Sequence, residues 1–191
     1  MVVVQGCHLR CRGCIAAGTH PLDGGEWVAT EDLGERLASL DDVEGVTFTG
    51  GEPFLQAAAL GRLLDLLHDG GHRLSTMSYS GYRLEWLQSN GSSAQNRLLQ
   101  RLDLLVDGPY VQRLHAPLRW RGSRNQRVHA LSARHRRELE AAPDRSAGVE
   151  VRLGEDLSFD WVGVPPVADF EASLAAHTKR NDRQSAVGAK R

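Results

Sequence analysis

Short apolar runs alternate along the chain with longer segments in which leucines recur at helical spacing. Each run is followed by glycine or by polar residues, which is typical of a buried strand that ends in a loop. Four of these runs predict the strands Val2–Val4, Val46–Thr49, Arg73–Tyr79 and Leu104–Val106. Strands that alternate with helices in this way favour a mostly parallel α/β sheet with right-handed crossovers.

The segment between the first two strands predicts a helix with one apolar face. That face consists of Leu33, Leu37 and Leu40. Thr30 is the expected N-cap, and the acidic pair Glu31–Asp32 would interact favourably with the helix dipole in the first turn. The loop before this helix, residues 6–25, is rich in glycine and has little periodicity, and a loop of this length is usually functional.

A second, leucine-rich helix is expected after the second strand. Pro53 fits its first position, and Gly70-Gly71 fits its end. Two shorter helices are expected between the third and fourth strands, at residues 84–89 and 94–101. The polar sequence between these two helices predicts a loop.

Beyond the fourth strand the pattern is weaker. Residues 122–127 predict a loop, and Val128–Leu131 predicts a strand after it. Farther on, residues 149–153 and 157–162 predict an antiparallel hairpin.

The length of 191 residues is enough for one domain with a substantial core, which we expect to span residues 1–166. The rest, residues 167–191, is expected to hold a weak helix at Asp169–Ala176 and then a disordered, polar and basic tail. Apolar residues make up 41% of the chain and charged residues 25%, both ordinary for a globular protein.

The formal net charge of −1 implies no overall attraction to nucleic acid or to a membrane. No apolar run is long enough to span a bilayer, and the first residues lack the charged region of a signal peptide. We therefore expect a cytoplasmic protein, in which thiols stay reduced and are available to bind a metal.

All three cysteines lie close together, as Cys7, Cys11 and Cys14. Because their number is odd, a disulfide would leave one unpaired, and neighbouring thiols on so tight a loop seldom meet disulfide geometry. The C-x3-C-x2-C spacing favours a [4Fe-4S] cluster whose fourth iron is open for chemistry. A Cys3His zinc site completed by His8 or His20 is the alternative.

Each of the four predicted strands ends in a distinctive sequence. Because parallel sheets bind ligands beyond the carboxyl ends of their strands, we expect these sequences to form one rim. They are Cys7, Gly50-Gly51-Glu52, Ser78–Gly81 and Asp107-Gly108.

The Gly50-Gly51-Glu52 sequence has two interpretations. One is a tight strand-to-helix turn that needs two glycines. The other is a ligand site, because the glycines let a ligand approach the backbone and the Glu52 carboxylate can accept hydrogen bonds from an ammonium group. A zinc site at the cysteines would leave this second sequence unexplained.

Together, the cysteine spacing and the downstream Gly-Gly-Glu resemble the radical S-adenosylmethionine (radical SAM) superfamily. Two further motifs, Leu105–Tyr110 and Arg121–Arg127, resemble the activating proteins of anaerobic ribonucleotide reductases. The resemblance covers residues 2–131 and, more weakly, extends to Pro166. The fold that it implies is a partial, open radical SAM β/α barrel with a mostly parallel sheet.

The resemblance also implies roles for individual residues. Cys7, Cys11 and Cys14 would hold three irons of a [4Fe-4S] cluster, and the fourth iron would bind S-adenosylmethionine. The other residues that it places at the cofactor are Gly13, Cys14, Ile15, Gly50, Gly51 and Glu52. Asp107 is a further candidate, as a structural or cation-binding carboxylate, although an ordinary Asp-Gly-Pro turn would explain it equally well.

The implied activity is reductive cleavage of S-adenosylmethionine, followed by formation of a glycyl radical on an anaerobic ribonucleotide reductase. The implied partners are that reductase and an electron donor such as flavodoxin or ferredoxin, without nucleic acid or a membrane. The basic stretch Arg119–Arg127 predicts either a solvated face or a docking surface for the reductase.

Three alternatives remain open from the sequence. The first is a stand-alone small radical SAM enzyme, and the second is an activase of another glycyl radical enzyme. The third is a metal-binding module without catalytic activity, which would have no need of the Gly-Gly-Glu turn.

Overall fold

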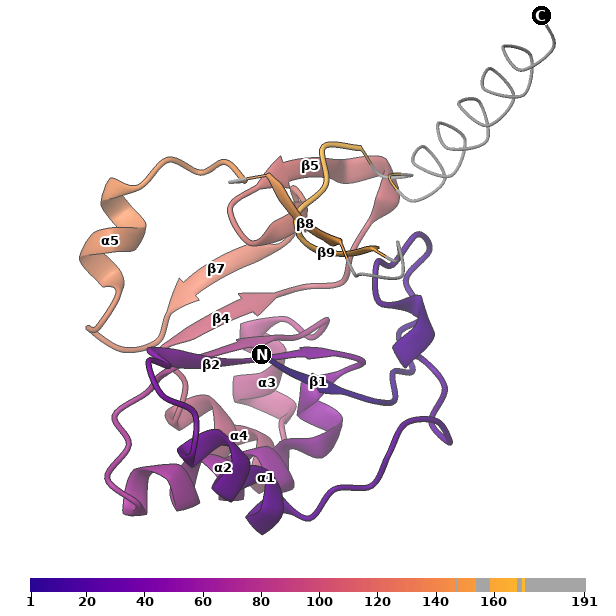
Figure 1. The fold of residues 1–191 in the computed structure, drawn as a ribbon. Helices are drawn as coiled ribbons and strands as arrows, with labels where there is room; N and C mark the ends of the chain where they lie inside the picture. Colours follow the sequence, from indigo (N-terminus) through magenta and orange to yellow (C-terminus); the bar gives the residue numbers. More distant parts are fainter. Residues whose placement is uncertain (147, 154–158, 168–169, 171–191) are drawn as a thin grey trace, which may run out of the picture.

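The central sheet has five strands in the order β1-β2-β3-β4-β7 (Figure 1). This computed structural model describes residues 1–146, 148–153, 159–167 and 170. The strands are β1 (Val2–Val4), β2 (Gly45–Gly50), β3 (Ser75–Tyr79), β4 (Leu104–Asp107) and β7 (Arg127–Ala130). The first four are parallel, and β7 pairs with β4 in the antiparallel direction. The predicted parallel α/β sheet is therefore confirmed, and the described strands form an open sheet with β1 and β7 at its edges.

Four helices cover one face of this sheet (Figure 1). They are α1 (Thr30–Ala38), α2 (Ala57–Asp69), α3 (Leu84–Asn90) and α4 (Ser93–Gln100). Fully buried side chains from strands and helices meet there, among them Phe48, Leu63, Leu87, Leu98 and Leu105. Because side chains alternate along a strand, Leu104 and Val106 point to the other face, where they pack with Met77 and Val128.

The opposite side of the sheet carries smaller elements (Figure 1). These are the hairpin of β5 (His115–Leu118) and β6 (Arg121–Ser123), α5 (Arg136–Ala141), and the hairpin of β8 (Val149–Leu153) and β9 (Phe159–Gly163). The late antiparallel hairpin was predicted correctly. The β5–β6 hairpin and α5 were not predicted, and β6 lies partly within the expected loop at residues 122–127.

The first helix differs from its prediction in two ways. Its N-cap is Ala29, which is extended and makes no side-chain cap, so Thr30 is the first helical residue rather than the cap. Leu40 is 54% exposed because the helix ends at Ala38, before Leu40 could join the apolar face. Leu33 and Leu37 pack against the core as expected.

The second helix begins more gradually than predicted. Pro53 does stand at the first helical position, but the first turn is a 3-10 helix, η2 (Pro53–Gln56), and α2 follows it. Gly70 is the C-cap, and Gly71 has φ +87°, so the glycine pair ends the helix as expected. The weak helix predicted at Asp169–Ala176 and the tail after it lie outside the described residues, apart from Phe170.

The packing of α2 against α1 allows a test of the finding that Leu40 does not belong to the buried face of α1. Leu63 is 1% exposed and its side chain approaches Gly34 of α1, so Leu63→Ala should lower the free energy of unfolding by about 2–5 kcal/mol. Leu40→Ala is the matched control and should change it by less than about 0.5 kcal/mol. Urea titration followed by circular dichroism measures both values, and equal losses would contradict the exposed position of Leu40.

Candidate cluster and cofactor site

The carboxyl ends of β1 and β2 are joined by backbone hydrogen bonds. Gly51 N–H donates to the Val4 carbonyl over 2.8 Å, and Glu52 N–H donates to the Gly6 carbonyl over 2.8 Å. On the other side of the edge, Ser80 N–H donates to the Val106 carbonyl over 2.9 Å. The sequences predicted to form one rim therefore lie together at the carboxyl ends of the parallel strands, which we call the edge of the site.

The cysteine loop begins directly at the end of β1. Gly6 N–H donates to the Thr19 carbonyl over 2.8 Å, and Cys7 N–H donates to the His20 carbonyl over 3.0 Å. These two bonds close the loop at its base, where a 3-10 turn, η1 (Ala17–Thr19), leads the chain back. Gly6 has φ +97°, a conformation that favours glycine and lets the chain turn away from the sheet.

The three thiols are free and close enough to influence one another. Burial raises the pKa of Cys11 and of Cys14, and a negative charge on Cys7 raises both further. A hydrogen bond with the backbone of Tyr110 acts in the opposite direction on Cys11. Cys11 and Cys14 are therefore difficult to ionise without a nearby positive charge, which the irons of a cluster would provide.

The alternative of a zinc site gains no support from the described geometry. Among residues 1–146, 148–153, 159–167 and 170, no three His, Cys, Asp or Glu side chains are grouped to hold one metal ion. His8, a proposed zinc ligand, instead places Nε2 3.2 Å from the Tyr82 hydroxyl. Thiols that ligate different irons of a cluster need not converge on one point, so the donor set fits a cluster better than zinc.

Glu52 is a buried carboxylate that connects the ends of β2 and β3. Its side chain is 1% exposed. Oε1 accepts hydrogen bonds from Phe54 N–H and the Ser80 hydroxyl, each over 3.0 Å, and Oε2 accepts one from Gly81 N–H over 2.7 Å. Burial raises the pKa of Glu52, and these three donors oppose that rise. The sequence predicted an acceptor for a cofactor amine, and the structure shows that much of the hydrogen-bonding capacity of Glu52 serves the rim itself.

The two glycines before Glu52 are required by the close approach of β1. Gly50 has φ +103°, and a β-carbon there would lie 2.5 Å from the Val4 carbonyl oxygen. A β-carbon at Gly51 would lie 2.2 Å from the Gly6 carbonyl oxygen, well inside contact distance. The turn interpretation therefore has a definite physical basis, and cofactor binding at these glycines stays a prediction.

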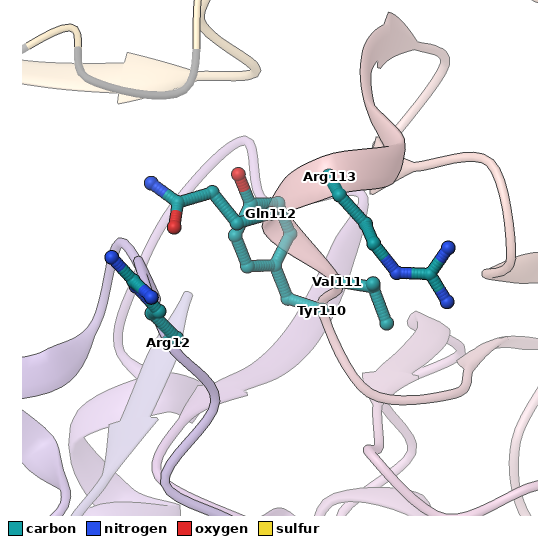
Figure 2. A pocket seen from close by; sticks show the side chains of 5 residues that line it. All are labelled: Arg12, Tyr110, Val111, Gln112 and Arg113. Atoms are coloured by element: carbon teal, nitrogen blue, oxygen red, sulfur yellow. The ribbon is translucent and has the colours of Figure 1, made fainter.

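Gly13 and Ile15 lie on the outer part of the cysteine loop. Gly13 has φ +71°, and a β-carbon there would approach the Gln112 side chain to 3.1 Å. Figure 2 shows the hollow beside this contact, lined by Arg12 and by Tyr110, Val111, Gln112 and Arg113. Its volume is about 320 Å³. Ile15 is exposed, so its predicted contact with the cofactor depends on a ligand that covers this loop.

Asp107 ends β4 and is fully buried. Oδ2 accepts a hydrogen bond from Leu84 N–H over 2.8 Å and lies 3.1 Å from His129 Nε2, while Oδ1 accepts one from Arg127 Nε over 3.1 Å. Despite burial, the neighbouring His129 and the hydrogen bonds from Arg127 hold the pKa of Asp107 well below the ordinary value. These contacts show a structural carboxylate that fixes β7 and α3 to β4, and a role at the cofactor stays a prediction.

The motif at residues 121–127 folds onto the turn that follows Asp107. Gln126 Nε2 donates to the Gly108 carbonyl over 3.2 Å, and Asn125 Nδ2 donates to the Pro109 carbonyl over 2.7 Å. Gln126 Oε1 also accepts from the backbone of Gly122 over 3.1 Å. The two motifs that set this chain apart in sequence are therefore one interlocked unit in space.

The comparisons with known proteins agree with this site. Residues 1–129 match a protein family described as a 4Fe-4S single cluster domain. One relative from Salmonella typhi is 33% identical over 135 residues, which are 67% of this chain and 85% of that protein. A Vibrio cholerae relative is 33% identical over 141 residues, or 68% of this chain and 85% of its own length. A relative from bacteriophage T4 is 26% identical over 132 residues, or 67% and 81%.

All three relatives are named anaerobic ribonucleoside-triphosphate reductase-activating protein. The chain belongs to this family of iron–sulfur activating proteins. In the part of the chain that the structure describes, every helix is too short or too polar to cross a membrane.

Sequence reasoning missed several contacts of the site. It assigned no contact to Tyr82, whose hydroxyl lies beside His8 and whose ring stacks on Trp86 with centroids 4.7 Å apart. It also missed Gln112, whose contact with Gly13 joins segments almost one hundred residues apart. No periodicity reports such a contact, because it depends on how the segment after β4 turns back.

Gly51 should tolerate no side chain. In Gly51→Ala, the new β-carbon must displace the Gly6 backbone and with it the base of the cysteine loop, so iron uptake on anaerobic reconstitution should fall at least about tenfold. Gly61→Ala is the matched control, since a β-carbon there meets nothing within 4 Å. Iron per protein and the absorbance of the cluster measure the effect, and full loading of Gly51→Ala would contradict the close approach.

Asp107→Asn should lower the free energy of unfolding by about 2 kcal/mol near neutral pH, because Arg127 loses a buried partner while itself remaining partly solvated. The folded-state pKa lies below the unfolded one, so the contribution of Asp107 is present above about pH 4 and is lost as the pH falls further. The difference between wild type and variant should therefore shrink below about pH 4, as measured by urea titration.

Glu85→Gln is the control for Asp107→Asn. Glu85 binds the same Arg127, but its side chain is 64% exposed, so its loss should have the smaller effect on stability. An equal loss of stability in both variants would mean that the exposed Arg127–Glu85 pair stabilises the fold as much as the buried Arg127–Asp107 pair does, against this prediction.

Proposed function

We propose that this protein is a radical SAM activase that forms a glycyl radical on an anaerobic ribonucleotide reductase. The observation that carries the proposal is the meeting of the three-cysteine loop and the Glu52 turn at one edge of the sheet, joined by the 2.8 Å bond from Glu52 N–H to the Gly6 carbonyl. The names of the relatives and the match to a 4Fe-4S domain supply the reaction class.

Cys7, Cys11 and Cys14 would hold the cluster. Cys7 is 7% exposed at the base of the loop, whereas Cys11 and Cys14 are half-buried farther out. A [4Fe-4S] cluster with S-adenosylmethionine would supply reductive cleavage of the sulfonium and abstraction of a hydrogen atom from a glycine. The protein's own contribution is orientation, because the backbone bonds of Gly6 and Cys7 fix the loop before any cofactor arrives.

The amine of S-adenosylmethionine would bind at the end of β2. Glu52 has three donors already, so a carboxylate with about four acceptor positions keeps one for an incoming ammonium group. Gly13, Cys14 and Ile15 would lie along the same cofactor on the cysteine loop. These assignments rest on the family resemblance and on the position of the residues along one edge.

The reductase would provide the missing wall of the site. Ile15 is 59% exposed, and Gly13 is also exposed, so this edge faces solvent in the structure. A reaction that forms a free radical needs water excluded from the reacting groups. A glycine-bearing loop of the reductase that covers this edge would exclude water and present the glycine in one step.

Two of the alternatives are weaker on particular observations. A metal-binding module without catalytic activity has no use for a buried carboxylate that organises the edge beside the cysteines. A stand-alone enzyme for small molecules would need to enclose its substrate, whereas the described hollow beside the loop is open and about 320 Å³. An activase of another glycyl radical enzyme differs only in its partner, which the experiment below identifies.

The test is direct formation of the radical. Reconstituted without oxygen, the protein should bind about four irons, and its reduced EPR signal should shift when S-adenosylmethionine is added. With S-adenosylmethionine and the anaerobic ribonucleotide reductase of the same organism, a glycyl doublet should appear in the EPR spectrum. Cys7→Ala, Cys11→Ala and Cys14→Ala should each abolish cleavage of S-adenosylmethionine.

Other outcomes separate the alternatives. Stoichiometric zinc without iron uptake would contradict the cluster. Cleavage of S-adenosylmethionine without a doublet on this reductase, but with one on a different glycyl radical enzyme, would keep the chemistry and change the partner.

A further inference from the structure

Arginines without acidic neighbours in sequence gather around the cysteine loop. Residues 1–22 contain no Asp or Glu, and neither do residues 108–137, the segment that runs from β4 through β7. The whole chain is nearly neutral, with a formal net charge of −1. The positive charge of these two segments must therefore be balanced by acids elsewhere in the molecule, or face solvent.

Several of these arginines are used inside the fold. Arg127 binds Asp107 and Glu85, and Arg121 binds Asp144 and the Gln126 carbonyl. Arg119 donates to the Leu139 carbonyl over 2.7 Å, and Arg134 donates to the Leu74 carbonyl over 2.8 Å. Most of the basic stretch predicted as a solvated face or docking surface is thus committed to internal contacts.

Six other arginines of these two segments are exposed, and among the described residues their side chains have no hydrogen-bond or ion-pair partner. Two of them, Arg136 and Arg137, belong to α5. The other four are Arg10, Arg12, Arg113 and Arg124, which we call the arginine surface. Arg12 and Arg113 line the same hollow, on either side of Tyr110 and Gln112 (Figure 2). Arg124 N–H donates to the Leu114 carbonyl over 2.9 Å, which places its backbone beside Arg113.

The arginine surface includes the exposed part of the cluster loop, because Arg10 and Arg12 belong to that loop and Arg113 shares a hollow with Arg12. Arg10 and Arg12 are the neighbours of Cys11 in sequence, and Arg10 has φ +45°, a backbone conformation that L-residues seldom adopt. Cys11 and Cys14 are the two half-buried thiols, whereas Cys7 lies beneath them. Unbalanced positive charge is therefore concentrated where the candidate cluster would come closest to solvent.

We propose that the arginine surface is the docking site of an acidic electron-carrier protein. The inference rests on the proposed function, because a cluster that cleaves S-adenosylmethionine must first be reduced by one electron. The carrier's reduced flavin or iron–sulfur centre would lose one electron, the [4Fe-4S] cluster held by Cys7, Cys11 and Cys14 would accept it and go from the 2+ to the 1+ state, and no bond would be made or broken.

The chemistry of the surface fits such a carrier better than other partners. Electron-transfer complexes are small, transient and steered by opposite charges, and they require only that the two redox centres lie close together. Exposed arginines without acidic partners provide that steering, and they flank the two outer cluster ligands. The reductase, in contrast, would have to cover Gly13 and Ile15 on the same loop to reach the reacting end of S-adenosylmethionine, so the carrier and the reductase would bind in turn and not together.

The experiment measures reduction of the cluster rather than turnover. Wild type and the Arg12→Glu/Arg113→Glu double variant, both reconstituted and without S-adenosylmethionine, are mixed with reduced flavodoxin in a stopped-flow spectrometer. The second-order rate constant should fall at least about tenfold in the variant at low ionic strength, and the two proteins should converge near 0.5 M salt, where the Debye length is only about 4 Å. Titration of the two proteins with oxidised flavodoxin should show weaker binding to the double variant than to wild type.

Two controls isolate the docking step. Arg36→Glu, an exposed arginine on α1 without a described ion-pair partner, makes one equivalent charge reversal away from the site and should leave the rate within about twofold. Photoreduced 5-deazariboflavin, which is small and uncharged, should reduce wild type and double variant equally. If the double variant is also slow with this reductant, the arginines act on the cluster and the docking proposal is wrong.

The remaining outcomes identify another partner. If flavodoxin reduces both proteins equally but the photoreduced variant forms less glycyl radical on the reductase, the surface belongs to the reductase. If a single-stranded oligonucleotide binds wild type and not the variant while flavodoxin shows no preference, the surface is a nucleic-acid site. Absence of a cluster in wild type would instead refute the proposed function, before docking is measured.

Discussion

The rim of this protein depends on one buried carboxylate. Glu52 leaves β2 and binds Gly81 N–H and the Ser80 hydroxyl at the end of β3, so it holds together two strand ends that would otherwise meet only through the sheet. Its own N–H binds the Gly6 carbonyl at the start of the cysteine loop. A desolvated carboxyl group is unfavourable unless it is well hydrogen-bonded, and these donors both satisfy Glu52 and fix the strand ends to one another.

The β4–β7 side of the sheet is organised in a similar way. Asp107 is the corresponding carboxylate at the end of β4, and it accepts hydrogen bonds from Arg127 and from the N-terminus of α3. The motif at 121–127 then closes over the Gly108 and Pro109 carbonyls. The segment that follows, including Tyr110 and Gln112, is thereby held against the cysteine loop. Two buried acids thus organise the two sides of one functional edge.

The sequence predicted the four parallel strands well, because buried strands such as Val46–Thr49 are short apolar runs with a clear end. It could not predict that β7 runs antiparallel, since a short apolar run carries no information about direction. It could not show that Glu52 also binds Gly81 within the rim, or that most arginines of the Arg119–Arg127 stretch make internal contacts. Partners such as Gly81, Asp107 and Asp144 are far away in sequence, and only folding brings them near. The cysteine loop was recognisable because all three cysteines of the chain lie within eight consecutive residues.

The Gly6–Thr19 and Cys7–His20 hydrogen bonds, which close the cysteine loop, bear on how the protein responds to loss of its cluster. A zinc finger gains its fold from its metal and loses it to a chelator. Here the scaffold is held by backbone bonds and by an independent core, so filling the site and folding the chain are separate events. Because these backbone bonds do not involve the cluster, the base of the loop would stay closed in a molecule that has lost its cluster, and the site could be refilled without refolding the chain.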